Sequence, residues 1–461
     1  MSVRGESGLT SGQRLDQLSM TKKHYGILFL LAGGGFFDGF DLYLAGSVLA
    51  AMVATHFSSV GHNASFISAT FFGLLLGTLI SAIVGDRLGR KFTSKYSLLI
   101  YGIATILCAV VHSFSWLVGM RFIAGIGLGA VIVTSYGLWV EFVPKRSRGF
   151  WTSTMSFLIN LSQPAAALLA LILIPHYGWR SLFWFAGIPP IIIWLLQLIY
   201  LPESPRWLEE KGRKEEANKI LSQFEGSASK PAHTIVQQSA PITKTNEKSA
   251  SLPTKYSLWA PGIRKITILS IIISVLNLVT WYTFTAWIPT FFVQSGLTVA
   301  KSFTFSFVIM LGAIPGNALA ALISDKLGRK KTLVILSILL GIIGLLYGYA
   351  SSPAYAMVYG FLFVMGGNIL IAIIMASYIP ELFPTPIRMA GSSLANAFGR
   401  AATILSPYLI AYLFQHGGQG AVFWSSFIMY IIMAICVLWL GRETKEKSLE
   451  EITHEEVLEA H

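Results

Sequence analysis

Two sequence motifs each occur twice in this chain. The number of residues between the first and second copy is almost the same for both motifs. Positions 85–91 read GDRLGRK, and positions 324–330, found 239 residues later, read SDKLGRK. Positions 141–148 read EFVPKRSR, and positions 381–388, found 240 residues later, read ELFPTPIR. Two halves that share one register predict a duplicated fold, and a duplicated fold tends to form its binding site between the two halves.

The composition is that of a membrane protein. Of the 461 residues, 54% are hydrophobic and only 12% are charged, whereas a soluble protein carries about 25% charged residues. The net charge of +12 lies in short clusters between long apolar runs, which argues against a nucleic-acid partner. Cys108 and Cys436 fall inside apolar runs, so neither a disulfide nor a metal site is indicated.

Twelve apolar stretches are each long enough to cross a bilayer as a helix of about 20 residues. Lys and Arg concentrate in alternate loops, and only Arg180 and Lys301 fall in the loops on the opposite side, so both termini are expected in the cytoplasm. The fold class is therefore an all-α membrane protein of two six-helix bundles. The expected division is a tail (1–24), a first bundle (25–201), a central cytoplasmic loop (202–263), a second bundle (264–440) and a tail (441–461).

The central loop has two parts of different character. Apolar residues recur at helical spacing between Trp207 and Phe224, which predicts an amphipathic surface helix. Residues 226–254 are rich in Ser, Lys, Thr, Gln and Pro, which is typical of a disordered segment.

The repeated motifs fall in cytoplasmic loops at corresponding places in the two bundles. In each copy an acid ends one helix, a glycine permits the tight reversal, and a basic pair faces the anionic leaflet. Glutamates at the neighbouring helix ends are expected to be structural partners of these basic loops. The gating or structural set is Asp86, Arg87, Gly89, Arg90, Glu141, Arg148, Asp325, Gly328, Arg329, Glu381 and Arg388.

With these motifs the chain resembles the major facilitator superfamily. The D-R-x-G-R-K loop after the second helix is similar to its signature, although Ala82 stands where glycine is usual. Positions 202–208 (PESPRWL) and 443–452 (ETKEKSLEEI, with Glu446 in place of glycine) resemble motifs of its sugar-porter and organic-ion branches. The resemblance implies alternating access, with the repeated loops holding the outward-open state.

Four ionisable residues fall deep within apolar stretches, at Asp38, Asp41, Arg121 and Arg400. Each costs about 2.5–3.5 kcal/mol on membrane-insertion scales, so such residues persist mainly where they pair or act. They are therefore the candidates for function.

Asp38 and Asp41 are three residues apart and share one helix face. Two close carboxylates in a low-dielectric cavity do not both ionise easily, which is the property that proton coupling needs. The Asp-Gly-Phe-Asp sequence at 38–41 resembles the first helix of aromatic acid:proton symporters, and the aligned acid in sugar porters faces an arginine at the position of Arg121. The hypothesis is proton coupling by Asp38, Asp41 and Arg121; the alternative is a permanent structural ion pair.

Arg400 has no obvious acidic partner in the second half of the chain. Its planar guanidinium suits a carboxylate, and Asn396 and Thr403 lie about one turn away on the same face. The segment around Gly399 resembles the eleventh helix of aromatic-acid and organic-anion carriers, which implies anion binding. The alternative is that Arg400 snorkels or bonds a neighbouring helix carbonyl.

Aromatic and amide side chains on the fourth, fifth and seventh helices could line a pocket for a flat ring. Interfacial belts and helix packing are an equally good explanation for aromatic residues in so aromatic a chain. The candidates are Tyr136, Trp139, Asn277, Trp281, Tyr282, Phe284 and Trp287, with Gln163, Asn317 and Asn368 as weaker ones.

The resulting expectation is a monomeric, proton-coupled importer of a small organic anion, such as a benzoate-like or nicotinate-like acid, in a bacterial inner membrane. No phosphate-binding loop or metal-ligand grouping is present, so neither an enzyme nor a cofactor is expected. Three alternatives are a proton-independent facilitator, an exporter of the same fold, and a receptor that does not transport.

Overall fold

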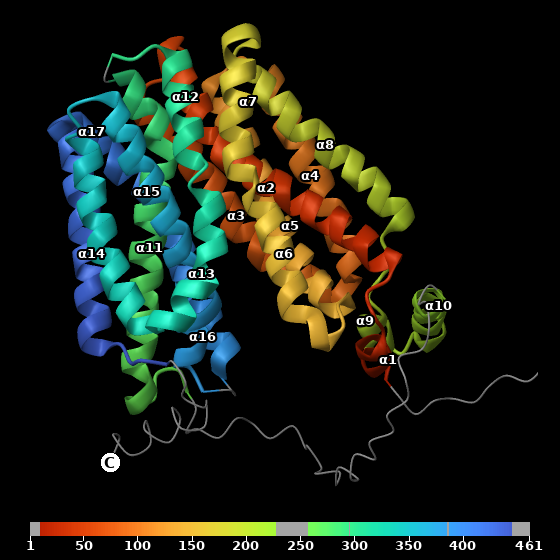
Figure 1. The fold of residues 1–461 in the computed structure, drawn as a ribbon. Coiled ribbons are helices and arrows are strands. Elements are labelled where there is room, and N and C mark those ends of the chain that lie inside the picture. Colours follow the sequence, from red (N-terminus) through yellow and green to blue (C-terminus); the bar gives the residue numbers. More distant parts are fainter. Residues whose placement is uncertain (1–9, 227–256, 295, 385–386, 445–461) are drawn as a thin grey trace, which may run out of the picture.

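The computed structural model describes residues 10–226, 257–294, 296–384 and 387–444. Apart from turns, these residues are helical, and the helices form two bundles that lie side by side (Figure 1). Eleven of the helices are long and apolar enough to cross a membrane. The longest of these has a non-helical residue at Gly418 (φ 66°, ψ −167°), which divides it into two arms and makes twelve spans. The predicted twelve-helix architecture is confirmed.

Each bundle contains six spans, some of them interrupted. In the first bundle a break near Leu161 separates α6 from α7, and in the second a π-helical turn, η3, separates α15 from α16. The first bundle consists of α2 (Lys22–Ala54), α3 (Val60–Leu88), α4 (Arg90–Val110), α5 (Phe114–Phe142), α6 (Arg148–Asn160), α7 (Ser162–Tyr177) and α8 (Arg180–Tyr200). The second consists of α11 (Pro261–Gln294), α12 (Val299–Met310), α13 (Ala313–Leu327), α14 (Arg329–Gly348), α15 (Pro353–Ala372), η3 (Ile373–Tyr378), α16 (Ile379–Leu382) and α17 (Arg388–Leu440).

Short helices cover the cytoplasmic end of the first bundle. The predicted amphipathic helix is present as two pieces, α9 (Pro205–Glu210) and α10 (Lys214–Glu225), because Gly212 turns the chain with φ +78°. The amphipathic character is confirmed, since Ala217, Leu221 and Phe224 are buried. The segment predicted to be disordered, 226–254, lies almost wholly outside the described residues.

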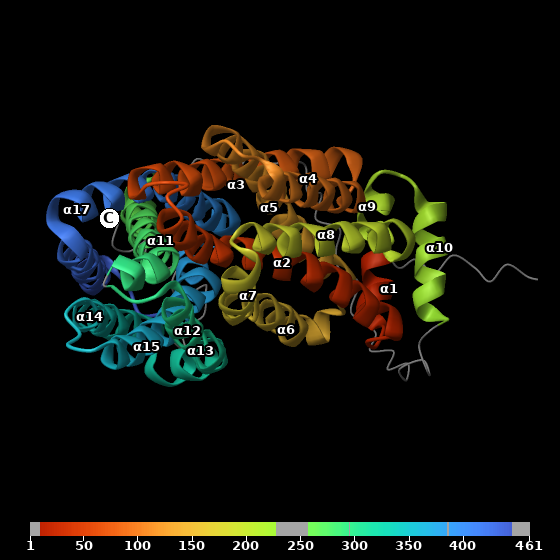
Figure 2. The same cartoon turned by 90° about the horizontal axis from the view of Figure 1, so that it is seen from above.

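The N-terminal tail contains a helix that the sequence did not predict. Helix α1 (Ser11–Gln17) begins with a capping box, in which the Thr10 hydroxyl and the Gln13 side chain each bond the other's backbone N–H. It packs beside α9 and α10, as seen from above in Figure 2. Arg14 donates to Glu225, which fixes α1 to α10.

The two bundles meet through their outer halves and near the middle of the membrane. Toward the outside, the Ser68 hydroxyl donates to the Ile404 carbonyl (2.6 Å), and the Phe71 ring packs edge-on against Tyr282 (4.6 Å between centroids). Backbones also approach closely there, since a Cβ on Gly46 would lie 2.8 Å from the Ala286 carbonyl oxygen. Together these contacts close the outer side of the interface.

The tight turn between α3 and α4 yields a stability prediction for Gly89. Its φ of +108° and ψ of 154° belong to glycine, and a Cβ would lie 2.3 Å from a carboxylate oxygen of Glu203. Gly89→Ala therefore adds a steric clash to backbone strain of about 1–3 kcal/mol. We expect a lower apparent Tm in thermal unfolding of the purified protein.

Gly178→Ala is the matched control. Gly178 has a similar backbone (φ 74°, ψ 171°), but nothing lies within 4 Å of the place that a Cβ would occupy there. The Tm decrease should be clearly larger for Gly89→Ala; equal decreases would contradict the contact with Glu203.

Candidate functional site

A buried ion pair lies in the first bundle, between α2 and α5. Arg121 contacts both carboxylate oxygens of Asp41, at 3.0 Å (Nη1 to Oδ1) and 2.7 Å (Nη2 to Oδ2), and both side chains are fully buried. The Arg121 Nε donates to the Thr70 hydroxyl (3.1 Å), and the guanidinium lies 4.9 Å from the centre of the Phe66 ring. The bidentate contact between Arg121 and Asp41 and the contact with the Phe66 ring offset the free-energy cost of removing both charges from water.

Close packing of α3 against α5 brings Arg121 to Thr70. A Cβ on Gly73 would lie 2.1 Å from the Phe122 carbonyl oxygen, and one on Gly125 would lie 2.3 Å from the Thr70 carbonyl oxygen. Small residues are the usual means of such helix approach in membranes. The glycines of α3 and α5 therefore position the arginine.

Asp38 and Arg400 come from different bundles and face each other electrostatically. Both Arg400 and Asp41 lie within electrostatic range of Asp38. Asp38 is 4% exposed, and its Oδ1 has no hydrogen-bond partner among the described residues. The sequence offered no acid for Arg400 within its own half; the acid within electrostatic range of it, Asp38, lies in the other half.

Several polar side chains surround this pair of charges. The Arg400 Nε donates to Asn396 Oδ1 (3.2 Å), and the Thr403 hydroxyl donates to the Arg400 carbonyl (2.7 Å). Tyr282 interacts electrostatically with both Asp38 and Arg400. Arg400 as a whole is half-buried.

Amide side chains join the bundles at the middle of the membrane. Asn160 donates to Asn317 (3.3 Å), Gln163 donates to Asn368 (3.1 Å), and Asn317 donates to Asn368 (3.2 Å). Gln163 therefore lies at the interface, where a substrate candidate should be. Asn160 was not predicted; its position three residues before Gln163 was the available signal.

The aromatic candidates divide into interface and core residues. Tyr282 and Trp281 lie at the interface, where Trp281 contacts the Tyr43 hydroxyl. Trp139 has no exposed surface and belongs to the core of the first bundle, which favours a packing role. Phe284 stacks on Phe363 with 3.8 Å between ring centres, inside the second bundle.

The other candidates on these helices lie near the interface or are buried. Tyr136 shares a hydrogen bond with Ser156 (2.9 Å) and lies within electrostatic range of Asp38. Trp287 and Asn277 are each 1% exposed, and Asn277 Nδ2 has no partner among the described residues.

A small cavity opens between the bundles beside Arg121. It is also lined by Thr70, Tyr43, Tyr282 and Thr285, and its volume is about 20 Å³. That volume holds roughly one water molecule. An aromatic ring would therefore enter the site only after the bundles move.

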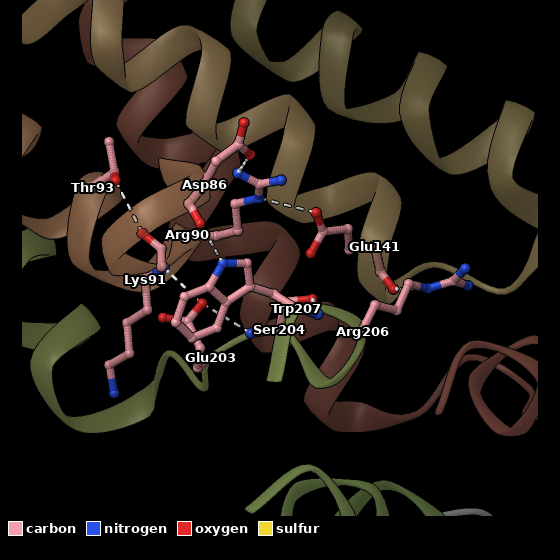
Figure 3. A network of polar contacts seen from close by, with 10 residues as sticks. Asp86, Arg90, Lys91, Thr93, Glu141, Glu203, Ser204, Arg206 and Trp207 are labelled. Atoms are coloured by element: carbon pink, nitrogen blue, oxygen red, sulfur yellow. Dashed lines mark hydrogen bonds and ion pairs between the residues drawn. The ribbon is translucent and has the colours of Figure 1, made fainter. Parts of the chain in front are cut away.

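At the cytoplasmic side, the repeated loops contain matching ion pairs. Arg90 pairs with Asp86 and, at 3.2 Å, with Glu141, as Figure 3 shows. Arg329 pairs with Glu381 at 3.3 Å in the second bundle. Both glutamates are therefore partners of the basic loops, as expected from the sequence.

A glutamate after the last span of each bundle binds the same loop. Glu203 Oε1 accepts the backbone N–H groups of Lys91 (3.0 Å) and Ser204 (3.0 Å). Glu443 Oε1 accepts those of Arg329 (2.8 Å) and Thr444 (3.1 Å). We call Glu203 and Glu443 the glutamate clamps.

The glutamate clamps were missed as a pair by sequence reasoning, although a signal existed. Glu443 follows Glu203 by 240 residues, which is the offset of the other repeats. Burial raises the pKa of Glu203 above its usual value, the N–H donors oppose this shift, and the charge of Glu141 adds to it. Ionised Glu203 thus depends on its backbone donors.

The remaining gating candidates are distributed around these clamps. Arg148 reaches Asp16 of α1 (3.3 Å) rather than Glu141, and Asp16 also accepts from Arg206 (3.1 Å). Arg388 donates to the Phe383 carbonyl (3.4 Å), and Arg87 is exposed. Gly328 (φ +85°) repeats the turn of Gly89, whereas the side chain of Asp325 lies outside the described residues.

Comparisons with known proteins agree with this architecture. Residues 27–455 match the model of the family described as "Sugar (and other) transporter". The chain is 34% identical to the inner membrane metabolite transport protein YdjE of Escherichia coli (96% of this chain, 98% of the relative). It is 29% identical to the niacin transporter NiaP of Acinetobacter baylyi (95% and 98%).

The fold also matches a solved structure. The inward-open xylose transporter XylE from E. coli superposes with a TM-score of 0.74 at 18% identity, over 94% of this chain and 99% of that one. With the family match over nearly the whole length, these findings identify the class of protein. The chain belongs to the sugar (and other) transporter family of the major facilitator superfamily, and it is a multi-pass membrane transporter rather than an enzyme.

Proposed function

We propose that this transporter imports a small aromatic carboxylate together with protons across a bacterial inner membrane, working as a monomer. The observation that carries the proposal is the electrostatic link between Asp38 of the first bundle and Arg400 of the second. A charged pair that spans the interface responds to anything that changes either charge. A carboxylate substrate and a proton are the two ligands that would do so.

Arg400 is the proposed anchor for the substrate carboxylate. Arg400 is half-buried, its guanidinium is oriented by Asn396, and a planar guanidinium can hold two carboxylate oxygens at once. Tyr282 and Trp281 at the same interface offer ring faces and a hydroxyl to a flat substrate. Niacin, the cargo in the name of one relative, is a substrate of this kind.

Asp38 is the proposed site where proton binding is coupled to substrate binding. When ionised, Asp38 satisfies the charge of Arg400, so a substrate carboxylate must displace it. When protonated, Asp38 no longer neutralises Arg400, and the substrate carboxylate takes its place. Proton and anion then bind together, which is the thermodynamic requirement of symport.

Asp41 and Arg121 have the proposed role of stabilising this site. Asp41 lies on the same face of α2 as Asp38, and Arg121 holds both its oxygens. This ion pair holds the segment of α2 that carries Asp38 against α5.

The cytoplasmic loops are the proposed gate. In the present conformation Arg90 and Arg329 pair with glutamates, and the outer halves of the bundles are in contact. In the outward-open state we expect the loops around Asp86 and Asp325 to meet the opposite bundle. Substrate release would then follow their separation.

Substitution of Arg400 tests the anion site. Arg400→Gln should weaken nicotinate and benzoate binding by about tenfold or more, because charge-assisted hydrogen bonds contribute about 1.5–3 kcal/mol. Arg400→Lys should recover only part of this, since it keeps the charge but loses the planar fork. Binding is measured by calorimetry on purified protein.

Arg264→Gln is the control for loss of one positive charge, because Arg264 is exposed on the same bundle. Its affinity for both acids should match that of the unsubstituted protein. Unchanged affinity in Arg400→Gln would remove Arg400 from the substrate site.

Substitution of the two aspartates tests proton coupling. The unsubstituted protein in proteoliposomes should concentrate nicotinate under an inward proton gradient and bind it more tightly as pH falls. Asp38→Asn imitates the protonated side chain, so its affinity should be nearly independent of pH. It should retain substrate counterflow while losing accumulation driven by the gradient.

Asp41→Asn separates the two carboxylates. If Asp38→Asn still accumulates substrate and Asp41→Asn does not, Asp41 carries the proton. Accumulation by both variants, at the level of the unsubstituted protein, would rule out coupling through this site and favour a facilitator.

A further inference from the structure

A second cavity lies at the cytoplasmic end of the first bundle, away from the interface between bundles. It is formed by α2, the start of α4, the end of α8 and α10, and its volume is about 660 Å³. Three lysines line it, Lys22, Lys23 and Lys91, and no acidic residue does. Such a volume is within the range of ligand sites, about 300–1,000 Å³.

The three lysines come from the starts of two helices, Lys22 and Lys23 from α2 and Lys91 from α4. Lys23 is held in place, because its ammonium donates to Gln223 (3.1 Å) and lies 5.9 Å from the Phe224 ring centre. Lys91 is anchored through its backbone N–H to Glu203, and its side chain extends away from Arg90 and Glu141 (Figure 3). Lys22 is exposed at the rim. This is a built cationic site rather than a scatter of surface lysines.

The other wall of the cavity is apolar and faces outward. Phe29 and Ile199, which line it, are 71% and 73% exposed, and both lie on membrane-spanning helices. Tyr200, next in the chain, is 67% exposed. Exposed apolar side chains on a spanning helix contact lipid chains. The cavity thus lies where the bilayer's hydrocarbon meets its cytoplasmic headgroups.

We propose that this cavity binds one anionic phospholipid of the cytoplasmic leaflet. The lipid phosphate lies among the ammonium groups of Lys22, Lys23 and Lys91, and an acyl chain follows Phe29 and Ile199. A cationic end joined to an apolar, lipid-facing wall fits an amphiphilic anion and leaves a small soluble anion without its second contact. Basic pockets at this depth are a recognised lipid-binding chemistry.

Bound lipid would link the cytoplasmic helices to the transport domain. Phe224 and Gln223 belong to α10, while Lys91 directly follows Arg90 of the gating loop. One headgroup therefore contacts α10, α2 and the turn held by Glu203. The expected effect is stabilisation of this end of the first bundle, independent of which substrate is carried.

The test uses the full-length protein in detergent, titrated with phosphatidylglycerol or phosphatidylcholine and read by native mass spectrometry and thermal unfolding. Phosphatidylglycerol should bind more tightly and raise the apparent Tm more. The variant Lys22→Gln, Lys23→Gln, Lys91→Gln should bind phosphatidylglycerol about tenfold or more weakly, since each lysine near an anionic surface contributes about 1 kcal/mol.

The matched control removes three exposed lysines from the same cytoplasmic region, Lys211→Gln, Lys214→Gln and Lys219→Gln, none of which lines the cavity. Its affinity should stay close to that of the unsubstituted protein. Equal weakening of both variants, or equal binding of the two lipids, would overturn the proposal. Displacement of phosphatidylglycerol by millimolar inorganic phosphate would also overturn it, by indicating a soluble-anion site.

A single variant keeps the test decisive if the triple variant is not monodisperse. Lys22→Glu changes an exposed side chain and should still reduce phosphatidylglycerol binding severalfold. Undiminished binding in Lys22→Glu would contradict the site.

Discussion

A charge in the middle of a membrane protein has to be met by an opposite charge, and this constraint organises the first bundle. Desolvating an ion costs several kcal/mol even after the protein relaxes, so Arg121 is stable only with both oxygens of Asp41 in contact. That geometry needs α5 to approach α3 closely enough for Thr70 to bind the same guanidinium. The glycines that allow this approach are therefore as necessary to the ion pair as its two charges. Asp38 lies about one helical turn before Asp41, so a second carboxylate is already close to it.

The two halves are alike at their cytoplasmic ends and unlike in the middle. Glu203 and Glu443 bind equivalent turns, and each bundle pairs an arginine of its loop with a glutamate. The cytoplasmic ends of the two halves thus keep equivalent contacts, in line with the sequence repeat that they share. The centre instead has Asp38, Asp41 and Arg121 in one half and Arg400 in the other. A site that distinguishes one side of a substrate from the other has to be asymmetric.

The sequence predicts the fold well because the duplication, the apolar runs and the basic loops are all local patterns. That Asp41 and Arg121 are neighbours was implied by the resemblance to sugar porters, and the structure pairs them. The sequence does not predict that Trp139 is core, because an aromatic residue on a spanning helix has the same pattern whichever way it faces. Nor does it predict the electrostatic interaction between Asp38 and Arg400, since that depends on how two bundles pack, which no local pattern encodes.

The contacts within each bundle are stronger than most contacts between the bundles, and this difference favours movement of one bundle relative to the other. The ion pairs of Arg121, Arg90 and Arg329 lie within one bundle each, whereas the hydrogen bonds that cross the interface, such as those of Gln163 and Ser68, join neutral groups. A neutral hydrogen bond contributes only about 0.5–1.5 kcal/mol net, because water replaces it when the surfaces separate. Rocking the bundles therefore preserves each bundle while exchanging weak contacts. The charge interaction between Asp38 and Arg400 differs from the neutral contacts, because a proton or an anion can change it. In the proposed mechanism, this interaction is the one through which ligand binding alters the balance between conformations.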